Sequence, residues 1–437
     1  MKTSRGRLGQ YNILKTEESL SKHLLKTELF SKKTLFNYLN MYKTIFIKPV
    51  FGPGKITVSS SNGKFIINSV TSLTTALNAE ETYQYLIHNE LNQKYYVIQP
   101  TKLNASFFQS QFQYFITFHR KSASENWSCI SRAEKSLSTF GNYYYTSFHR
   151  KMENLAILAA KKLGEAFPDC NTIVFDIVYD LRGGIWIQDS VLHFPISKWS
   201  QYHALTANHS LKSFVPNTAL LTKGTLYNFL TKYKEIIIKP CLGQRGIGIV
   251  QISTNNHLSY EIHSGRTKYT TSTFEETFHF IEKHFLSKKY YIVQQKLLLA
   301  TINDCPMDVR VITQKVDSTW KVTGKIVKVA GNNFIITNAA QKLLFLEDAI
   351  QNSNIPHINF LKLEDKIDEL CISAAIQLEE HNAKITIVGF DIGITQQGSV
   401  WIIEGNYIPD LSMFNKLSDK RIYRNIINNK KNKSDFL

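Results

Sequence analysis

Residues 225–240 read TLYNFLTKYKEIIIKP, and residues 34–49 read TLFNYLNMYKTIFIKP. In both phrases leucine and aromatic side chains recur at the three- and four-residue spacing of an amphipathic helix. A short apolar run follows and ends at a lysine and a proline, which is typical of a buried strand with a charged side chain at its end. The chain therefore encodes the same helix–strand unit twice.

The two halves stay similar beyond this phrase. Residues 7–49 align with residues 198–240 without a gap, at an offset of 191. Two later segments match at offsets of 195 and 215: 94–103 with 289–298, and 174–190 with 389–405. A period of about 200 residues is much longer than that of a solenoid repeat, so it indicates duplication of a whole domain. We predict two tandem domains, residues 1–190 and residues 191–437.

The order of elements predicts an α+β fold in each half. In the second half the helix–strand unit leads through a glycine-containing turn to another strand. The further elements that the patterns predict are a helix at 272–286, strands at 290–295, 308–316 and 320–330, a helix at 364–382, and a closing strand pair at 384–394 and 399–408. Strands separated by both helices and hairpins favour α+β over a doubly wound sheet. The basic tail RIYRNIINNKKNKSDFL, residues 421–437, is expected to be frayed.

Composition limits the classes of function. The 437 residues carry a net charge of +17, which favours anionic partners such as nucleotides, acidic peptides, nucleic acid or surface polymers. No segment approaches the roughly 18 apolar residues of a membrane span, and the N-terminus lacks the apolar stretch of a signal peptide. The five cysteines are scattered, which argues against a disulfide framework or a zinc site. We expect a soluble, cytoplasmic protein without a membrane partner.

A glycine-rich turn follows the second lysine-ending strand, in KPCLGQRGIGIV at residues 239–250. Backbone N–H groups in such a turn can approach phosphate oxygens, because Gly246 and Gly248 carry no side chain, while Lys239 supplies a positive charge. The segment matches neither the P-loop nor the dinucleotide-binding fingerprint. A simple tight hairpin would give the same pattern, so phosphate binding and a hairpin both remain open here.

Three oxygen-bearing side chains end the last two predicted strands. Asp391 ends IVGFD, and Glu404 ends VWIIE, with Asn406 two residues further on. Residues two apart on a strand lie on one face, so Glu404 and Asn406 are expected to share a face. One or two carboxylates suit Mg²⁺ that also binds phosphate oxygens and water. The alternative is that these polar groups cap a turn.

Taken in order, these motifs resemble the ATP-grasp family, most closely its YheC/YheD branch. The resemblance covers residues 193–415 and rests on Lys198-Trp199, VPNT at 215–218, IIIKP, and the D, E-x-N and P series ending at Pro409. It implies a set of nucleotide-binding residues: Lys198, Lys239, Gly246, Ile247, Gly248, Gln294, Gln295, Lys296, Leu297 and Lys325. It implies Asp391, Glu404 and Asn406 as metal ligands, and Arg310, Lys328 and Asp308 as catalytic residues. A strand-end asparagine corresponds to Asn338, but AAQKLL follows it where the family usually has two glycines.

The resemblance also implies an activity. It is that of a ligase that uses ATP and Mg²⁺, or Mn²⁺ in its place, to activate a carboxylate as an acyl phosphate and join it to an amine. The partners expected are a small acidic or peptide-like substrate and an amine acceptor, with no nucleic acid. A spore association and a homo-oligomer are both compatible with the resemblance. The alternatives are an ATP-grasp phosphotransferase that acts on a hydroxyl, and a non-catalytic coat-associated scaffold.

The first half matches this pattern incompletely. Lys48 and Asp176 are retained, and Asp189 aligns with Glu404. The aligned positions that differ are Val191 for Asn406, Phe112 and Tyr114 for Asp308 and Arg310, and Arg7 for Lys198. An apolar residue in place of a metal ligand and an aromatic residue in place of a cation remove groups that the chemistry needs. We predict that the first half is a degenerate ATP-grasp-like domain.

Overall fold

The computed structural model describes residues 4–101, 112–134, 145–179, 183–244, 246–255, 258–331, 340–356 and 358–431. The chain forms two compact units. Unit 1 comprises Met1–Phe194, Leu220–Asn228 and Thr273–Tyr291, and unit 2 comprises Pro195–Ala219, Phe229–Ser272 and Ile292–Leu437. Three segments of the predicted second domain, 191–194, 220–228 and 273–291, therefore belong to unit 1.

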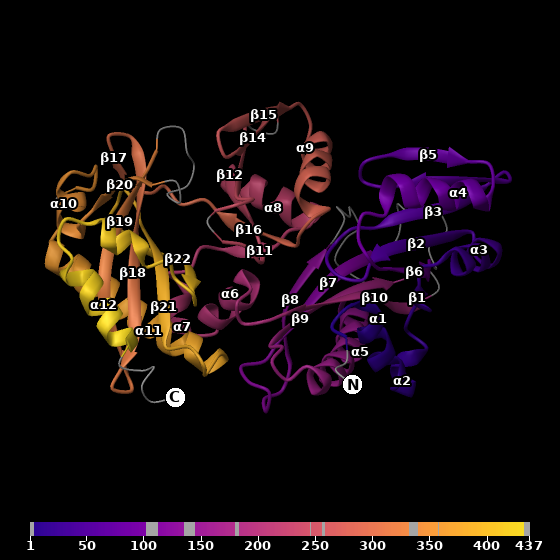
Figure 1. Cartoon of the computed structure of the whole chain (residues 1–437), viewed down its shortest axis with the longest axis horizontal. Coiled ribbons are helices and arrows are strands. Elements are labelled where there is room, and N and C mark those ends of the chain that lie inside the picture. Colours follow the sequence, from indigo (N-terminus) through magenta and orange to yellow (C-terminus); the bar gives the residue numbers. More distant parts are fainter. Residues whose placement is uncertain are drawn as a thin grey trace. The chain divides into compact units, whose positions relative to one another are not determined.

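Unit 1 begins with a six-stranded sheet in the order β1-β6-β2-β3-β4-β5. Its strands are β1 (Glu28–Leu29), β2 (Thr44–Pro49), β3 (Ile56–Ser61), β4 (Lys64–Asn68), β5 (Leu73–Ala76) and β6 (Tyr96–Pro100). Helices α3 (Lys32–Met41) and α4 (Ala79–Tyr85) contribute to this part of unit 1 (Figure 1). Every residue of β2 is buried, as the apolar run TIFIKP predicts.

A four-stranded sheet in the order β10-β9-β7-β8 completes unit 1. Its strands are β7 (Phe112–His119), β8 (Ser128–Glu134), β9 (Thr172–Tyr179) and β10 (Ile185–His193). Helices α1 (Arg7–Lys15), α2 (Glu18–Ser21) and α5 (Tyr145–Ala166) contact one another and pack their apolar side chains against this sheet. Arg7, the first residue of α1, is thereby placed close to β10.

The repeated phrase folds in the same way at both places. In the first copy Ser31 and Thr34 form a capping box, in which each side chain bonds the other residue's backbone N–H. In the second copy Thr222 and Thr225 exchange the same two hydrogen bonds, at 2.8 and 3.0 Å, before helix α8 (Lys223–Tyr233). Both caps satisfy backbone donors that a helix start leaves without partners, so the helices begin at matching residues.

The second copy of the first sheet has the order β11-β16-β12-β13-β14-β15. Its strands are β11 (Thr218–Leu220), β12 (Glu235–Pro240), β13 (Val250–Thr254), β14 (Tyr260–Ser264), β15 (Thr267–Thr271) and β16 (Tyr291–Gln295). Helix α9 (Phe274–Ile281) continues as one π-helical turn, Glu282–Leu286, where the sequence predicts a single helix over 272–286. The order of strands is the same as in β1–β6.

The last sheet lies in unit 2 and has the order β20-β19-β18-β21-β22, with the short β17 (Thr301–Ile302) paired to β18. The other strands are β18 (Cys305–Val316), β19 (Thr319–Ala330), β20 (Ala340–Leu344), β21 (Ile387–Ile394) and β22 (Val400–Asn406). One face packs against the main core of unit 2, which includes helix α11 (Phe360–His381). The shorter helices of this unit are α6 (Lys198–Thr206), α7 (His209–Lys212) and α10 (Leu346–Gln351).

The basic tail is not frayed over its described part. Residues Arg421–Lys431 form helix α12, which packs on β18 and β19. Ile422 and Ile426, one helical turn apart, place their side chains in a small core with Ile312, Ile326 and Phe414. The expectation of a frayed tail was therefore wrong, because two well-spaced isoleucines anchor an otherwise polar helix.

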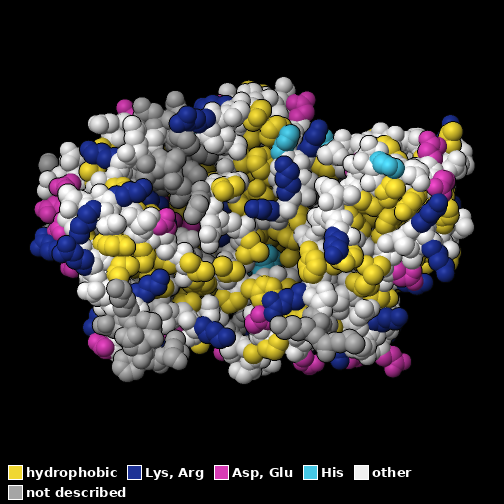
Figure 2. All heavy atoms as spheres, in the orientation of Figure 1, with side chains coloured by type: hydrophobic (Ala, Val, Ile, Leu, Met, Phe, Trp, Pro, Cys, Tyr) yellow, Lys and Arg dark blue, Asp and Glu magenta, His cyan; other side chains and the backbone are white. Residues whose placement is uncertain are grey.

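The α+β fold class is confirmed, with antiparallel sheets and helices in both units. The repeated strand order matches the repeated sequence, although the duplication itself stays a prediction. Figure 2 shows Lys and Arg side chains dispersed over the face of the molecule in view. None of the described helices is both long and apolar enough to cross a membrane.

Candidate functional site

The last sheet of unit 2 gathers the predicted catalytic side chains on one face. Asp308 pairs with Lys328 across β18 and β19, and Arg310 pairs with Asp391 across β18 and β21. Asp391 in turn pairs with Glu404 of β22. Because side chains alternate along a strand, residues 308 and 310 share a face, and their direct partners share it with them. Four strands therefore supply one polar cluster.

Arg310 and Asp391 form the centre of this cluster. Nε and Nη2 of Arg310 donate to the two carboxylate oxygens of Asp391 at 2.8 and 3.0 Å. Lys328 Nζ lies 2.9 Å from Asp391 Oδ1 and 3.2 Å from Asp308 Oδ1. These four side chains are only 3 to 8% exposed, so their charges are held in place by one another rather than by water.

The cluster shifts the ionisation of its members. Burial on its own raises the pKa of Asp391, but Arg310 and Lys328 outweigh it and hold that pKa well below its ordinary value. Burial likewise opposes the charged form of Lys328, and Asp308 and Asp391 raise its pKa in spite of it. Both groups are therefore charged at neutral pH, and the site keeps its cations and carboxylates in fixed positions.

Lys198 and Glu404 lie at the edge of this cluster. Lys198 is the first residue of α6, and its Nζ lies 3.3 Å from Glu404 Oε2 and donates to the carbonyl of Gly243 at 3.0 Å. Its backbone N–H donates to the carbonyl of Cys241 at 2.9 Å, which fixes the start of α6 beside the glycine-rich turn. The lysine therefore joins the predicted phosphate turn to the predicted metal ligands.

Lys239 ends β12 and is almost fully buried, at 5% exposure. Burial lowers the pKa of its ammonium, against the attraction of Glu404 and Asp391. Gly246 and Gly248 in the following turn have φ angles of +70° and +82°, which are strained for residues with a side chain. Ile247 between them is 68% exposed, so this part of the turn lies at the surface.

A cavity of about 360 Å³ extends from Lys239 to the predicted nucleotide-binding residues of β16 and the segment that follows it. Its lining includes Gln294, Gln295, Lys296 and Leu297 together with Lys239, Asp308, Asp391 and Glu404. Gln294 Nε2 donates to Thr218 Oγ1 at 3.0 Å, and Lys296 Nζ lies 2.8 Å from Glu235 Oε2. The apolar wall is formed by Ile237, Ile249, Leu298 and Ile403, which the sequence analysis missed because they resemble ordinary core residues of strands.

Lys325 does not join this cavity. Lys325 lies on β19 opposite Val311 of β18, three residues before Lys328. Its side chain therefore projects from the opposite face of the sheet. There it forms ion pairs with Glu364 and Asp368 of α11, at 2.7 and 2.9 Å. The assignment of Lys325 to nucleotide binding was therefore wrong. Asn338 lies outside the described residues.

The three predicted metal ligands lie together. Asn406 Nδ2 is 3.5 Å from Asp391 Oδ2 and 3.3 Å from Glu404 Oε1. Among the described residues no group of three or more His, Cys, Asp and Glu side chains could hold a metal. The set is instead two carboxylates and an amide, and such oxygen donors fit a hard cation that takes its other ligands from phosphate and water.

The charges of the site favour an anion. Lys198, Lys239, Arg310 and Lys328 face three carboxylates, those of Asp308, Asp391 and Glu404, so the formal balance is one positive charge. A polyphosphate with a divalent cation would add negative charge where the four cations converge. The geometry therefore fits a metal-bound polyphosphate better than a neutral ligand.

The model of the YheC/D-like ATP-grasp family matches residues 4–133 and 193–437. The chain belongs to this family. Two endospore coat-associated proteins of Bacillus subtilis (strain 168) are similar in sequence. YheD is 28% identical over 226 residues, which cover 50% of this chain and 49% of YheD, and YheC is 23% identical over 215 residues, which cover 48% of this chain and 59% of YheC. The chain thus spans about half the length of the curated relatives it matches.

Solved structures give a weaker match. The D-alanine-D-alanine ligase from Coxiella burnetii overlaps 55% of this chain and 60% of its own, with a TM-score of 0.31 and 14% identity. So low a score does not bear on function.

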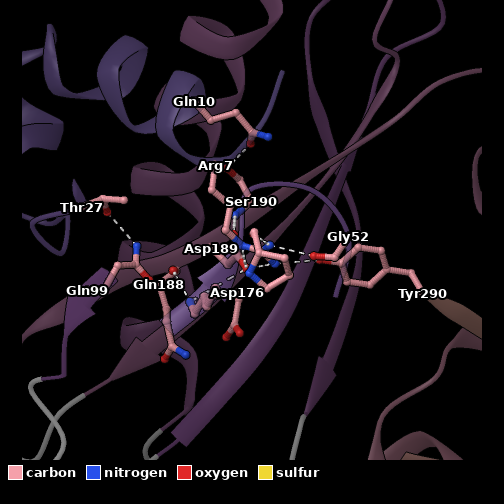
Figure 3. A network of polar contacts seen from close by, with 12 residues as sticks. Arg7, Gln10, Thr27, Gly52, Gln99, Asp176, Gln188, Asp189, Ser190 and Tyr290 are labelled. Atoms are coloured by element: carbon pink, nitrogen blue, oxygen red, sulfur yellow. Dashed lines mark hydrogen bonds and ion pairs between the residues drawn. The ribbon is translucent and has the colours of Figure 1, made fainter. Parts of the chain in front are cut away.

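Unit 1 of this YheC/D-like protein contains a second polar cluster on equivalent strands (Figure 3). Asp176 and Asp189 face each other across β9 and β10, as Asp391 and Glu404 do across β21 and β22. Phe115 lies opposite Asp176, where Arg310 lies opposite Asp391, and Gln113 takes the position of Asp308. The sequence comparison of the two halves matched Phe112 and Tyr114 with Asp308 and Arg310, which is one residue out of register.

Proposed function

We propose that unit 2 binds Mg·ATP and uses it to join a carboxylate to an amine through an acyl phosphate. The single observation that carries this proposal is the convergence of Arg310, Lys328 and Lys239 on Asp391 and Glu404, beside a cavity that extends to Gln294. Membership of the YheC/D-like ATP-grasp family supports nucleotide binding. The reaction and its substrates belong to the proposal alone.

The nucleotide takes the cavity in this proposal. The apolar side chains of Ile237, Ile249 and Ile403 bound the base, and the backbone of Gln295–Leu297 offers it hydrogen bonds. The phosphates meet Lys198, Lys239 and the backbone of the glycine turn. The lowered pKa of Lys239 fits this role, because burial destabilises the charged ammonium more than the nearby carboxylates offset, and a phosphate would stabilise it further.

Asp391, Glu404 and Asn406 would hold Mg²⁺, or Mn²⁺, which neutralises phosphate charge when bound. Lys198 balances Glu404 in the described structure and is free to transfer that contact to a phosphate oxygen, since its own Nζ bonds only a carboxylate and a carbonyl there. In this proposal, Lys198 therefore exchanges its contact with Glu404 for one with a phosphate oxygen when the nucleotide binds.

The chemistry needs no covalent intermediate with the protein. A substrate carboxylate oxygen attacks the γ-phosphorus of ATP, and the bond to the β-phosphate oxygen breaks to release ADP. An amine then attacks the acyl carbon, inorganic phosphate leaves, and the nitrogen loses a proton to solvent. Arg310 and Lys328 stabilise the negative charge that develops, because they are already fixed by Asp391 and Asp308 and need little reorganisation.

A product analysis tests the proposal. The full chain is incubated with Mg·ATP and pools of small acids, peptides and amines, and hydroxylamine is added in a parallel reaction to trap acyl phosphate as a hydroxamate. ADP with an amide or hydroxamate supports a ligase. ADP with a phosphoester would show a phosphotransferase instead, and nucleotide binding without any turnover would favour a scaffold.

The matched control for this test is Glu404→Gln, which preserves size and removes a charge needed for metal binding. It should abolish product formation while leaving the thermal melting curve close to that of the unaltered chain, since Glu404 is one of the less buried members of the cluster. Full activity in this variant would refute the proposed metal ligands. An association with the spore coat, as the names of YheC and YheD state for those proteins, is part of the proposal only.

A further inference from the structure

The cation at the start of the first helix differs between the two polar clusters. Arg7 begins α1 as Lys198 begins α6, and the backbone N–H of Arg7 donates to Val50 as that of Lys198 donates to Cys241. Both side chains reach the second carboxylate of their site and a carbonyl of the following turn. Arg7 and Lys198 therefore occupy equivalent positions, and at this position unit 1 has an arginine where unit 2 has a lysine.

All three guanidinium nitrogens of Arg7 are engaged within unit 1 (Figure 3). Nε donates to both oxygens of Asp189 at 3.0 and 2.8 Å, and Nη2 lies 2.7 Å from Oδ2. Nη1 donates to the carbonyls of Pro49 and Gly52, and Nη2 also donates to the hydroxyl of Tyr290 at 3.2 Å. A lysine has a single nitrogen and cannot bridge so many acceptors in fixed geometry.

The carboxylates of unit 1 are thereby compensated by protein groups. Asp189 is bound by Arg7, with Lys48 Nζ at 3.9 Å, and Lys48 donates to the carbonyl of Gln188 at 3.1 Å. Gln113 Nε2 donates to Asp176 Oδ1 at 2.8 Å. A divalent cation would have to displace a bidentate, almost fully buried arginine to reach Asp189, whereas the equivalent carboxylate of unit 2, Glu404, is paired with a lysine.

The cavity wall beside Asp176 and Asp189 is more apolar than the equivalent wall in unit 2. Phe115 stands at the register position of Arg310, and Val174 and Val191, which face each other, stand where Gly389 and Asn406 face each other. The cavity of about 230 Å³ in unit 1 is lined by all three of these apolar side chains. A phosphate group there would lose its hydration without gaining the cation and amide that unit 2 offers.

We infer that Arg7 closes the first site, acting as an internal counter-ion in place of a metal-bound nucleotide, so that the chain binds one nucleotide, in unit 2. The number of nucleotides that the chain binds does not depend on whether the proposed ligase reaction takes place. A chain that binds nucleotide without turnover would leave the inference standing.

Isothermal titration of the full chain with Mg·AMPPNP, a nucleotide that is not hydrolysed at the γ-phosphate, gives the stoichiometry. We expect one site in the unaltered chain and no measurable binding after Lys239→Ala, which removes a cation from unit 2 only. A second site in the unaltered chain, or one site remaining in Lys239→Ala, would overturn the inference.

A reversal experiment tests which residues close the site. In the Lys239→Ala background, Arg7→Lys with Phe115→Arg and Val191→Asn restores the unit 2 side chains to unit 1, and we expect Mg·AMPPNP binding to return at least tenfold above the background signal. A folded variant, by circular dichroism, that does not bind would refute the role of these positions. If the triple variant does not fold, the stoichiometry of the unaltered chain decides.

A stability measurement gives an independent readout. Arg7→Lys alone should lower the melting temperature measurably, because several of the acceptors that Arg7 bridges lose their donors. The matched control is Arg5→Lys, since Arg5 forms an exposed pair with Asp169 and should change the melting temperature little. Equal decreases in melting temperature for the two substitutions would contradict the role of Arg7 as the internal counter-ion of the first site.

Discussion

Arg310 and Asp391 lie directly opposite each other on β18 and β21, and the guanidinium spans both carboxylate oxygens at 2.8 and 3.0 Å. This pair occupies the middle of the candidate site and is less than 9% exposed on either side. Its geometry means that the cation proposed to stabilise the reaction is held in place by a proposed metal ligand.

A double-mutant cycle should detect that coupling. Arg310→Met should destabilise the chain by about 3–5 kcal/mol, because Asp391 loses a bidentate partner inside the protein. Asp391→Leu should also be destabilising, and the double variant should be less so than the sum of the two, with a coupling of about 0.5–3 kcal/mol. Urea unfolding measures all three. Additive effects would mean that the pair does not act as a unit.

Lys325 and Lys328 give a matched comparison on one strand. Lys328→Met should remove turnover, since its ammonium lies between Asp308 and Asp391. Lys325→Met should leave turnover near that of the unaltered chain and cost only about 1 kcal/mol of stability, as expected for a partly exposed ion pair with Glu364 and Asp368. Loss of turnover in Lys325→Met would restore the sequence-based assignment.

The two lysine-ending strands should differ in function. Lys239→Ala should abolish nucleotide turnover, because Lys239 lines the cavity of unit 2. Lys48→Ala should leave the KM for ATP unchanged, since Lys48 serves a carbonyl and a carboxylate in the closed site of unit 1. Steady-state kinetics on both variants checks this. An inactive Lys48→Ala chain with native stability would transfer the working site to unit 1.

Acid should weaken the candidate site in a defined direction. The folded-state pKa of Asp391 is depressed, so its contribution to stability is present above the unfolded value of about 3.9 and is lost as the pH falls toward the folded value. The stability gap between the unaltered chain and Asp391→Asn should therefore narrow as the pH is lowered from about 6 to 3. Denaturant unfolding at several pH values measures the gap, and a constant gap would contradict the depressed pKa.

Two glycines separate backbone strain from ligand binding. Gly248 in the predicted phosphate turn and Gly265 between β14 and β15 have φ angles of +82° and +61°. Alanine at either position should cost about 1–2 kcal/mol of stability. Only Gly248→Ala should also raise the KM for ATP severalfold, because the turn then loses its approach to phosphate. Equal KM values for the two variants would argue that the turn is merely a hairpin.

The sequence predicts the site better where residues repeat. The paired carboxylates, both lysine-ending strands and the α+β class follow from matched phrases and from alternation along strands. Lys325 was assigned to the site because the family resemblance implied it, although its odd spacing from Lys328 puts it on the helix-covered face. The register of β7 was misjudged by one residue, although the offset of 195 from the preceding matched segment, carried forward without a gap, gives Gln113 and Phe115 as the equivalents of Asp308 and Arg310.

Helix α12 was missed for another reason. Its composition is basic and polar, as in a tail, and two isoleucines one turn apart are too weak a periodic signal without the surface they pack on. The helix propensity of these residues alone contributes little stability, whereas burial of Ile426 against β18 and β19 stabilises the helix.

One hydrogen bond occurs in both halves with the same partners. Gln99 Nε2 donates to Thr27 Oγ1 at 2.7 Å, and Gln294 Nε2 donates to Thr218 Oγ1 at 3.0 Å. Because all four side chains are buried, both amides are shielded from solvent and should give resolved nitrogen-15 resonances. The molecule thus contains its own spectroscopic reference: a nucleotide that enters beside Gln294 should shift that amide signal while the Gln99 signal stays where it is.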